Sequence, residues 1–284
     1  MNRLIFNQVK KIIPRISSTE LIALRSGTVS LDGDIFRGEV SLPKKLTLPP
    51  NNDNLDRGVN RLLEKFGSQQ QIYPSENINE IMTEIGDNKL LSLIIKKEWG
   101  GNHCSTTQLS SLLTKLSSVN PALGVTVMVP NSLGPAELLY LYGTKAQQDR
   151  FLPKLATGEL VPCFGLTGPN NGSDAVGSID RGTVVKEGGK LFIKISVNKR
   201  YITLAPIANI AGIAFNLEDP DGLLESGKSG ITVALVEKGT CGLRQETHHN
   251  PLNVGFPNGT LKGDLLIPIE QVIGGVDNVG EGWK

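Results

Sequence analysis

The chain has 284 residues, of which 39% are hydrophobic and 20% charged, and its formal net charge is +1. This length can bury one large core or two ordinary ones, and the composition is that of a folded globular protein. A charge near zero argues against nucleic acid as the main partner. Three scattered cysteines without metal-ligand spacing favour a reducing cytoplasm and argue against a zinc site.

The first 13 residues combine apolar and basic side chains at helical spacing. They lack the apolar stretch and cleavage site of a signal peptide, and no apolar run in the chain is long enough to cross a bilayer. Two interpretations stay open for residues 1–15: a helix packed on its own domain, which is the commoner case, or a helix on a membrane surface. Residues 14–53 are rich in Pro, Gly, Asp and Asn and predict an irregular extension.

Helical periodicity dominates the next hundred residues. Asn54 is expected to cap a helix that ends at Gly67, and a second helix is expected over 77–85. Asn120 followed by proline marks a later helix start, and the almost wholly apolar stretch after it predicts helices buried inside a bundle. Two further helix starts have capping-box spacing, Ser105 with Gln108 and Thr144 with Gln147.

After residue 160 the hydrophobic period changes to that of strands. Strand candidates rich in Ile and Val lie at 182–185, 191–196, 201–204, 207–217, 231–236 and 265–269. The turn-forming residues 186–190 predict a hairpin between the first two. The predicted fold class is therefore α+β, with an N-terminal α-helical domain followed by a small antiparallel β-sandwich or barrel. The predicted divisions are 1–75, 76–160, 161–275 and 276–284.

Two patterns that resemble known sites are weak in context. Residues 222–229 match the phosphate-binding pattern GxxxxGKS, which requires a following helix, whereas a strand-like run follows here. P-loop nucleotide binding is therefore only a distant alternative. The three histidines, His103, His248 and His249, have no catalytic or chelating arrangement, and they are expected to be surface polar residues.

The strongest candidate site joins two strand ends. A short apolar run at 161–166 breaks into a segment rich in Gly, Asn and Pro that carries Thr167 and Ser173, and a second segment carries Tyr201 and Thr203. Hydroxyls, free N–H groups and an aromatic face at two strand ends suit a planar polar heterocycle. Ordinary turn chemistry is the alternative, and on spacing alone it is favoured.

These segments also carry a family resemblance. Residues 164–174 read Phe-Gly-Leu-Thr-Gly-Pro-Asn-Asn-Gly-Ser-Asp, which resembles the acyl-CoA dehydrogenase signature Tyr/Phe-x-x-Thr-Glu-Pro-x-Ala-Gly-Ser-Asp. Residues 198–205 are similar to the second signature, usually Lys-x-Trp-Ile-Thr-Asn. Residues 131–134, 143–148 and 152–159 match as well. The resemblance covers nearly the whole chain and is closest to the long bacterial acyl-CoA dehydrogenases of fatty-acid β-oxidation.

The resemblance implies a flavoenzyme that binds FAD between a helical domain, a β domain and a C-terminal helical bundle. It implies that Leu166 and Thr167 face the flavin ring, that Gly172 and Ser173 approach the flavin and the CoA part of the substrate, and that further residues line the site. The cofactor-binding residues expected are Phe164, Leu166, Thr167, Gly172, Ser173, Tyr201, Ile202 and Thr203. The substrate-binding residues expected are Ser173 and Asn131, and no metal ligand is expected.

The resemblance also leads us to expect a chain that stops before the C-terminal four-helix bundle. That bundle carries the catalytic glutamate in the family, so no catalytic base is assigned here. Gly168 stands where the family usually has Glu, and Asn171 stands where it usually has Ala. Either the chain is part of a working FAD-dependent acyl-CoA dehydrogenase, or it is an inactive remnant or binding module of the same fold.

The expected partners follow from the same resemblance. They are a fatty acyl-CoA that is dehydrogenated to the trans-2-enoyl-CoA in fatty-acid β-oxidation, and an electron-transfer flavoprotein that accepts the electrons. The complete protein is expected to be a homodimer or homotetramer. Its expected location is the cytoplasm, with the inner membrane surface as a contact for residues 1–15.

Overall fold

The computed structural model describes residues 2–12, 30–39, 52–132, 134–175, 179–225, 227–246 and 248–282. The chain divides into two compact units, Met1–Leu48 and Pro49–Lys284. The first unit contains α1 (Asn2–Ile12) and α3 (Ser30–Arg37). The predicted first helix is confirmed, whereas α3 lies in a stretch that was expected to be irregular.

Helix α3 owes its formation to charges rather than to an apolar stripe. Asp32 lies in its first turn and Arg37 in its last turn, where each complements the helix dipole. Arg37 also pairs with Asp34 one turn earlier. A search for apolar periodicity does not register these contributions, so the expectation of an irregular segment over 30–37 is corrected.

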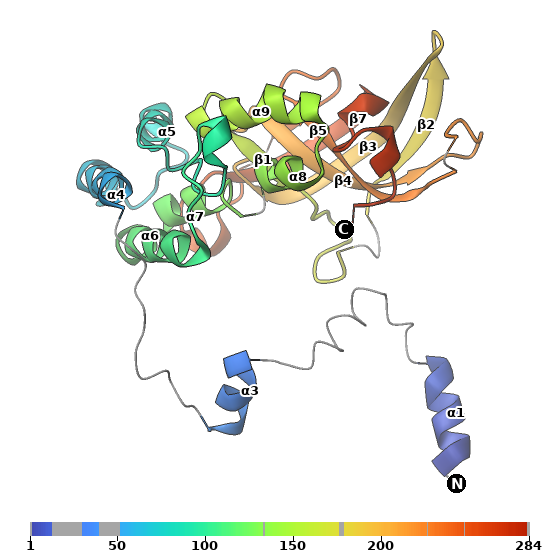
Figure 1. The fold of residues 1–284 in the computed structure, drawn as a ribbon, viewed down its shortest axis with the longest axis horizontal. Helices are drawn as coiled ribbons and strands as arrows, with labels where there is room; N and C mark the ends of the chain where they lie inside the picture. The colour runs from blue at the N-terminus through green and yellow to red at the C-terminus, as the bar shows by residue number, and fades with distance from the viewer. Residues whose placement is uncertain are drawn as a thin grey trace. The chain divides into compact units, whose positions relative to one another are not determined.

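The second unit begins with a run of helices (Figure 1). They are α4 (Asp53–Phe66), α5 (Ile78–Asp87), α6 (Thr106–Val119), α7 (Pro121–Met128), α8 (Pro135–Tyr142) and α9 (Lys145–Thr157). Both predicted capping boxes form at the starts of α6 and α9, and Asn120 caps α7 by accepting a hydrogen bond from Leu123 N. The local sequence signals of this region are confirmed.

The cap of α4 is one correction in this region. Asn52, not Asn54, accepts the hydrogen bond from Leu55 N, at 3.4 Å. Starting the helix at Asp53 places Asp53 and Asp56 in the first turn, where the helix dipole stabilises negative charge. Gly67 ends the helix as predicted.

Helices α4, α5, α6 and α7 share one hydrophobic core. Buried residues of α4, among them Val59 and Leu62, pack with Ile81 and Ile85 of α5 and with Leu116 of α6. The predicted division at residue 75 separates α4 from the helices with which it shares this core. The structural division instead falls between residues 48 and 49.

In the described part of the chain, seven strands form one curled sheet in the order β1-β4-β2-β3-β7-β6, with β5 also paired to β4. The strands are β1 (Pro162–Gly165), β2 (Arg181–Glu187), β3 (Lys190–Thr203), β4 (Ile210–Glu218), β5 (Gly230–Glu237), β6 (Arg244–Glu246) and β7 (Asn258–Pro268). The predicted α+β class and the β2–β3 hairpin are confirmed. The sheet is mixed rather than wholly antiparallel, because β1 and β2 both run parallel to β4.

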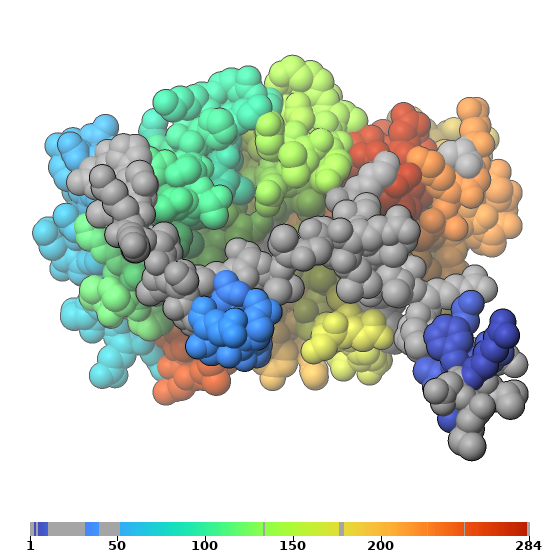
Figure 2. Space-filling model, turned by 60° about the horizontal axis from the view of Figure 1, so that its bottom comes forward, coloured from blue at the N-terminus to red at the C-terminus, as the bar shows by residue number. Residues whose placement is uncertain are grey.

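Helices α8 and α9 cover one face of this sheet (Figure 1). Leu139 of α8 and Leu152 of α9 pack with Ile210 and Ala214 of β4 and with Leu235 of β5. A second apolar cluster lines the inner face of the curl and includes Val184, Ile193 and Phe215. In space-filling view, the green helices and the yellow-to-red strands of the second unit form one continuous surface (Figure 2).

The phosphate-binding pattern at 222–229 lacks the context it requires. Strand β5 begins at Gly230, directly after the pattern, as the sequence predicted. The carboxylate of Asp219 accepts hydrogen bonds from Leu223 N and Leu224 N, so it closes the turn itself. Among the described residues, no helix is both long and apolar enough to span a membrane.

Candidate functional site

The two predicted segments lie side by side, one directly after β1 and the other along the last residues of β3. Arg200 N, near the end of β3, donates a hydrogen bond to the carbonyl oxygen of Thr167, just after β1, at 3.0 Å. Lys199 Nζ donates to the carbonyl oxygen of Leu166 at 3.1 Å. The union of two strand ends expected from sequence is therefore present, although β1 and β3 are not paired as neighbouring strands.

Lys199 stands at the Lys of the second signature, but the sequence analysis assigned it no role in the site. Its side chain is 0% exposed, and its ammonium lies 3.1 Å from Asp180 Oδ2. Burial lowers the pKa of Lys199, and the Asp180 carboxylate opposes that shift. Asp180 also accepts a hydrogen bond from Asn198 N. The alternation of buried positions along β3 continues through Lys199, and this pattern could have identified it as inward-facing.

The loop after β1 is organised by the side chain of Asn171, which is 6% exposed. Its Oδ1 accepts a hydrogen bond from Gly168 N at 2.7 Å. Its Nδ2 donates to the carbonyl oxygens of Leu166 and Ala175, both at 3.1 Å. Gly172 and Ser173, which the resemblance assigns to cofactor and substrate, are exposed on this loop.

Strand β3 ends in an irregular segment that presents Tyr201. The register of β3 with β7 shifts between Lys199 and Ile202, and Tyr201 has a positive φ of 57°. The Tyr201 side chain is 50% exposed, and its ring stacks on His249 with centroids 4.4 Å apart. Ile202 is buried in the inner core, which leaves its backbone for any contact with a ligand.

Thr203 adjoins a buried amide that sequence reasoning missed. Asn258 Nδ2 donates to Thr203 Oγ1 at 3.3 Å from the facing position on β7. Asn258 is 2% exposed, and its Oδ1 has no hydrogen-bond partner among the described residues. No sequence pattern distinguishes Asn258 from an ordinary turn residue, because its position opposite Thr203 is set by strand pairing.

The histidines at 248 and 249 are half-buried, which corrects the expectation that they are surface residues. His248 packs edge-on against Tyr73 at 4.9 Å between ring centroids, and its Nδ1 lies 3.1 Å from the carbonyl oxygen of Asn258. The Nε2 atoms of both histidines are buried without a partner among the described residues. Burial lowers the pKa of His249, and the charges of His248, Arg200 and Lys262 lower it further. His103 is exposed, as expected.

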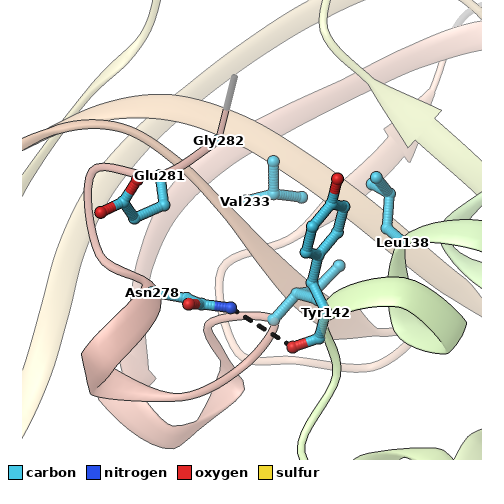
Figure 3. A pocket seen from close by; sticks show the side chains of 7 residues that line it. Leu138, Tyr142, Val233, Asn278, Glu281 and Gly282 are labelled. Atoms are coloured by element: carbon cyan, nitrogen blue, oxygen red, sulfur yellow. Dashed lines mark hydrogen bonds between the residues drawn. The ribbon is translucent and has the colours of Figure 1, made fainter. Parts of the chain in front are cut away.

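Phe164 and Leu166 project to the other face of β1, where they pack beside the cluster formed by α8, α9 and the sheet. A cavity of about 50 Å³ lies in this cluster between Leu138 and Tyr142 of α8, Val233 of β5 and a turn near the end of the described chain (Figure 3). In that turn Asn278 Nδ2 donates to the carbonyl oxygen of Tyr142. This volume has room for a few water molecules.

Asn131, predicted to bind substrate, lies in the helical part of the second unit, just after α7. It is 1% exposed; its Oδ1 accepts from Leu93 N, and its Nδ2 donates to the carbonyl oxygens of Leu90 and Val127. These contacts occupy the whole amide, so its substrate contact remains a prediction that the geometry does not support. Among the described residues, no group of three or more His, Cys, Asp or Glu side chains is placed to hold a metal ion.

Comparison with known proteins addresses the family. The family model described as "Acyl-CoA dehydrogenase, N-terminal domain" matches residues 55–159. An acyl-CoA dehydrogenase of Bacillus subtilis is 31% identical over 183 residues, which are 62% of this chain and 46% of that protein. The chain belongs to the acyl-CoA dehydrogenase family. A second relative is the very long-chain specific mitochondrial acyl-CoA dehydrogenase of Bos taurus. It is 28% identical over 282 residues, and the match covers 95% of this chain and 42% of that protein.

The fold of this family member is shared with solved structures. An acyl-CoA dehydrogenase from Bacillus anthracis, complexed with FAD, superposes with a TM-score of 0.69 at 20% identity over 84% of this chain and 39% of that one. The likeness extends across the helices and the sheet together. The chain spans less than half the length of the curated relatives it matches.

Proposed function

We propose that this chain supplies the helical and sheet parts of an FAD-dependent acyl-CoA dehydrogenase that converts fatty acyl-CoA thioesters to trans-2-enoyl-CoA in β-oxidation. The family assignment supports the reaction class. The observation that carries the proposal is the hydrogen bond from Arg200 N to the carbonyl of Thr167, which joins the two signature segments. The FAD complex of the structural neighbour supports the cofactor.

The residues where the two signature segments meet fit a flavin ring. Such a ring is planar, apolar on its faces and rich in hydrogen-bonding groups on one side. Thr167 and Thr203 contribute hydroxyls, and Tyr201 contributes a half-exposed aromatic ring. Beside Thr203, the Oδ1 of Asn258 is buried without a partner among the described residues. A buried acceptor left unpaired is costly, and an N–H of a bound ring would satisfy it.

The chemistry divides between the cofactor and the chain. A bound flavin supplies the acceptor for the hydride that leaves the β-carbon of the thioester. The residues of this chain bind and orient: Thr167 and Thr203 hold the ring through their hydroxyls, and the exposed Ser173 contacts the CoA portion. No residue of this chain is assigned as the base that removes the α-proton. The electrons are proposed to pass to an electron-transfer flavoprotein.

The test is the visible absorption spectrum of the purified chain after FAD is added and the excess removed. We expect retained flavin with a shifted band, and about tenfold weaker binding in Thr167→Val and Thr203→Val, because each loses one hydrogen-bonding group. Thr183→Val, on β2, is the matched control and should bind as the unmodified chain does. A chain that retains no flavin would contradict the proposal that it binds FAD by itself.

The same sample separates the proposed enzyme from the alternative of a binding module. Addition of a fatty acyl-CoA should bleach the flavin band once a C-terminal helical segment of a related acyl-CoA dehydrogenase is added to supply the base, because no base is assigned in this chain. A binding module would instead bind the thioester, as shown by calorimetry, without bleaching. Binding without bleaching would support the assignment of FAD as the cofactor and would contradict the proposed dehydrogenase activity.

We also propose that α1 contacts the inner membrane surface from the cytoplasmic side. Its apolar side chains Ile5, Phe6 and Val9 are exposed, and Arg3 and Lys10 add positive charge that anionic lipid attracts. Co-sedimentation with vesicles rich in anionic lipid tests this. Phe6→Ser should reduce the bound fraction, while Asn7→Ser, on the same helix, should not. Equal binding by both variants would contradict the proposal.

A further inference from the structure

Gly168 and Asn171 are tightly coupled by geometry. Asn171 is more than nine-tenths buried, and its Oδ1 and both N–H groups of its Nδ2 form hydrogen bonds within its own loop. A Cβ on residue 168 would lie 2.7 Å from Asn171 Oδ1 and 3.0 Å from the carbonyl oxygen of Asn198. The first distance is shorter than real Cβ contacts allow. Only glycine at 168 therefore permits the observed position of the Asn171 amide.

The contacts of Asn171 surround one particular residue. Its side chain holds the carbonyl of Leu166 and the N–H of Gly168, the two peptide groups that flank Thr167. The carbonyl of Thr167 itself accepts from Arg200 N. Thr167 is thus held by its neighbours on both sides and by the end of β3, while its own side chain is half-buried and takes part in none of these bonds.

We infer that Asn171 is a positioning residue that fixes Thr167 for flavin binding, and that Gly168 is retained because a larger residue would displace the Asn171 amide. This inference rests on the proposed function for its ligand. It makes Gly168 and Asn171 a single unit, so that losing either one has the same consequence as losing both. Asn171 touches no reacting atom; it acts through the backbone on either side of Thr167.

The experiment compares Gly168→Ala, Asn171→Ala and the double variant in the 284-residue chain, with FAD as the probe. Each single variant should weaken FAD binding by about tenfold, the loss expected when a hydrogen-bonded buried group is removed. The double variant should be no weaker than either single one, because the added methyl group occupies the space that the Asn171 side chain has left. Asn170→Ala, in the adjacent exposed position, is the matched control and should bind normally.

Asn171→Asp separates hydrogen bonding from packing. The carboxylate keeps the shape of the side chain but cannot donate to the carbonyls of Leu166 and Ala175. It should weaken FAD binding as strongly as Asn171→Ala and should reduce the shift of the bound flavin band. If Asn171→Asp binds FAD as the unmodified chain does, or if the two single effects add in the double variant, the inference is overturned.

Hydrogen exchange without FAD keeps this inference distinct from the proposed function. Exchange at the amides of Gly168 and Arg200 should be faster in Asn171→Ala and unchanged in Asn170→Ala. In Asn171→Asp it should be faster at Arg200, while the carboxylate can still accept from Gly168 N. If the unmodified chain binds no FAD, the proposed function fails while faster exchange still supports the role of Asn171 in holding Thr167. Unchanged exchange at both amides overturns that role whether or not FAD binds.

Discussion

Two buried asparagines make equivalent sets of bonds in the two parts of the second unit, but over very different ranges of sequence. In the helical part, Asn131 bonds Leu93 N and the carbonyl of Leu90, 38 and 41 residues earlier in the chain. In the sheet part, the bonds of Asn171 all reach residues within five positions. Asn131 therefore joins elements that are distant in sequence, whereas Asn171 shapes a single loop.

This difference has a thermodynamic consequence. Bonds between distant segments can be lost only when those segments separate, so they contribute to the stability of the whole fold. Bonds within one loop can be lost when that loop opens to water while the rest stays folded. The first arrangement suits a structural core, and the second suits a loop that orders around a ligand.

The largest expected effect is at Asn131. Asn131→Ala should lower the free energy of unfolding by about 4 kcal/mol, because it leaves buried backbone groups of Leu90 and Leu93 unpaired. Urea denaturation measures this change. Ser132→Ala, which removes a hydroxyl bonded within its own helical turn, is the control and should cost less than about 1 kcal/mol. A similar loss in both variants would contradict the expectation that hydrogen bonds between residues distant in sequence contribute more to the free energy of unfolding than local ones.

The next largest loss of stability is expected at Lys199, because its hydrogen bond to the carbonyl of Leu166 joins residues 33 positions apart. Lys199→Met should lower the free energy of unfolding by about 3 kcal/mol, since it leaves the nearly buried Asp180 carboxylate without its cation. Adding Asp180→Asn should recover part of the loss. Thermal unfolding of both variants checks this, and a double variant less stable than Lys199→Met would contradict the pairing.

Asn171→Ala should change global stability little. We expect a loss below about 1 kcal/mol in the free energy of unfolding, because the freed groups can reach water when the loop opens. Urea denaturation under the conditions used for Asn131→Ala gives the comparison directly. A loss equal to that of Asn131→Ala would show that the loop does not open independently of the fold.

The smallest effect concerns pH. The folded pKa of His249 lies below its ordinary value of 6.5, so near and below that pH the unfolded chain binds more protons than the folded one. Stability should therefore fall as pH decreases from 7 to 5. His249→Asn should show a shallower fall over this interval by thermal unfolding. An identical slope in both proteins would exclude His249 as a contributor.

Local signals in the sequence predicted the helical part well. The capping boxes at Ser105 and Thr144 and the Asn120 cap each depend on residues within one helical turn, and all three form. The displaced cap of α4 and the charge-stabilised α3 show the limit of the method. The cap of α4 lies two residues before the predicted one, and the search for apolar spacing did not register Asp32 and Arg37 at the ends of α3.

The sequence predicted that two segments join in the candidate site, but it did not identify every residue that shapes the site. Thr167 and Tyr201 came from hydroxyl and aromatic residues at strand ends and from the family resemblance. Asn258 and the hydrogen bonds of Asn171 within its loop were not predicted, because neither residue has a distinguishing local pattern. Strand register places Asn258 opposite Thr203, and loop packing buries Asn171.

The sequence by itself determined most of the helices from α4 to α9, the hairpin between β2 and β3, and the two segments that carry the site. These properties depend on caps, turns and periodicity within a few residues. Only the tertiary structure decided the parallel pairing of β1 and β2 with β4, the burial of Lys199 and the meeting of Arg200 with Thr167. These contacts join residues tens of positions apart, and they form because the curled sheet must bury its inner face.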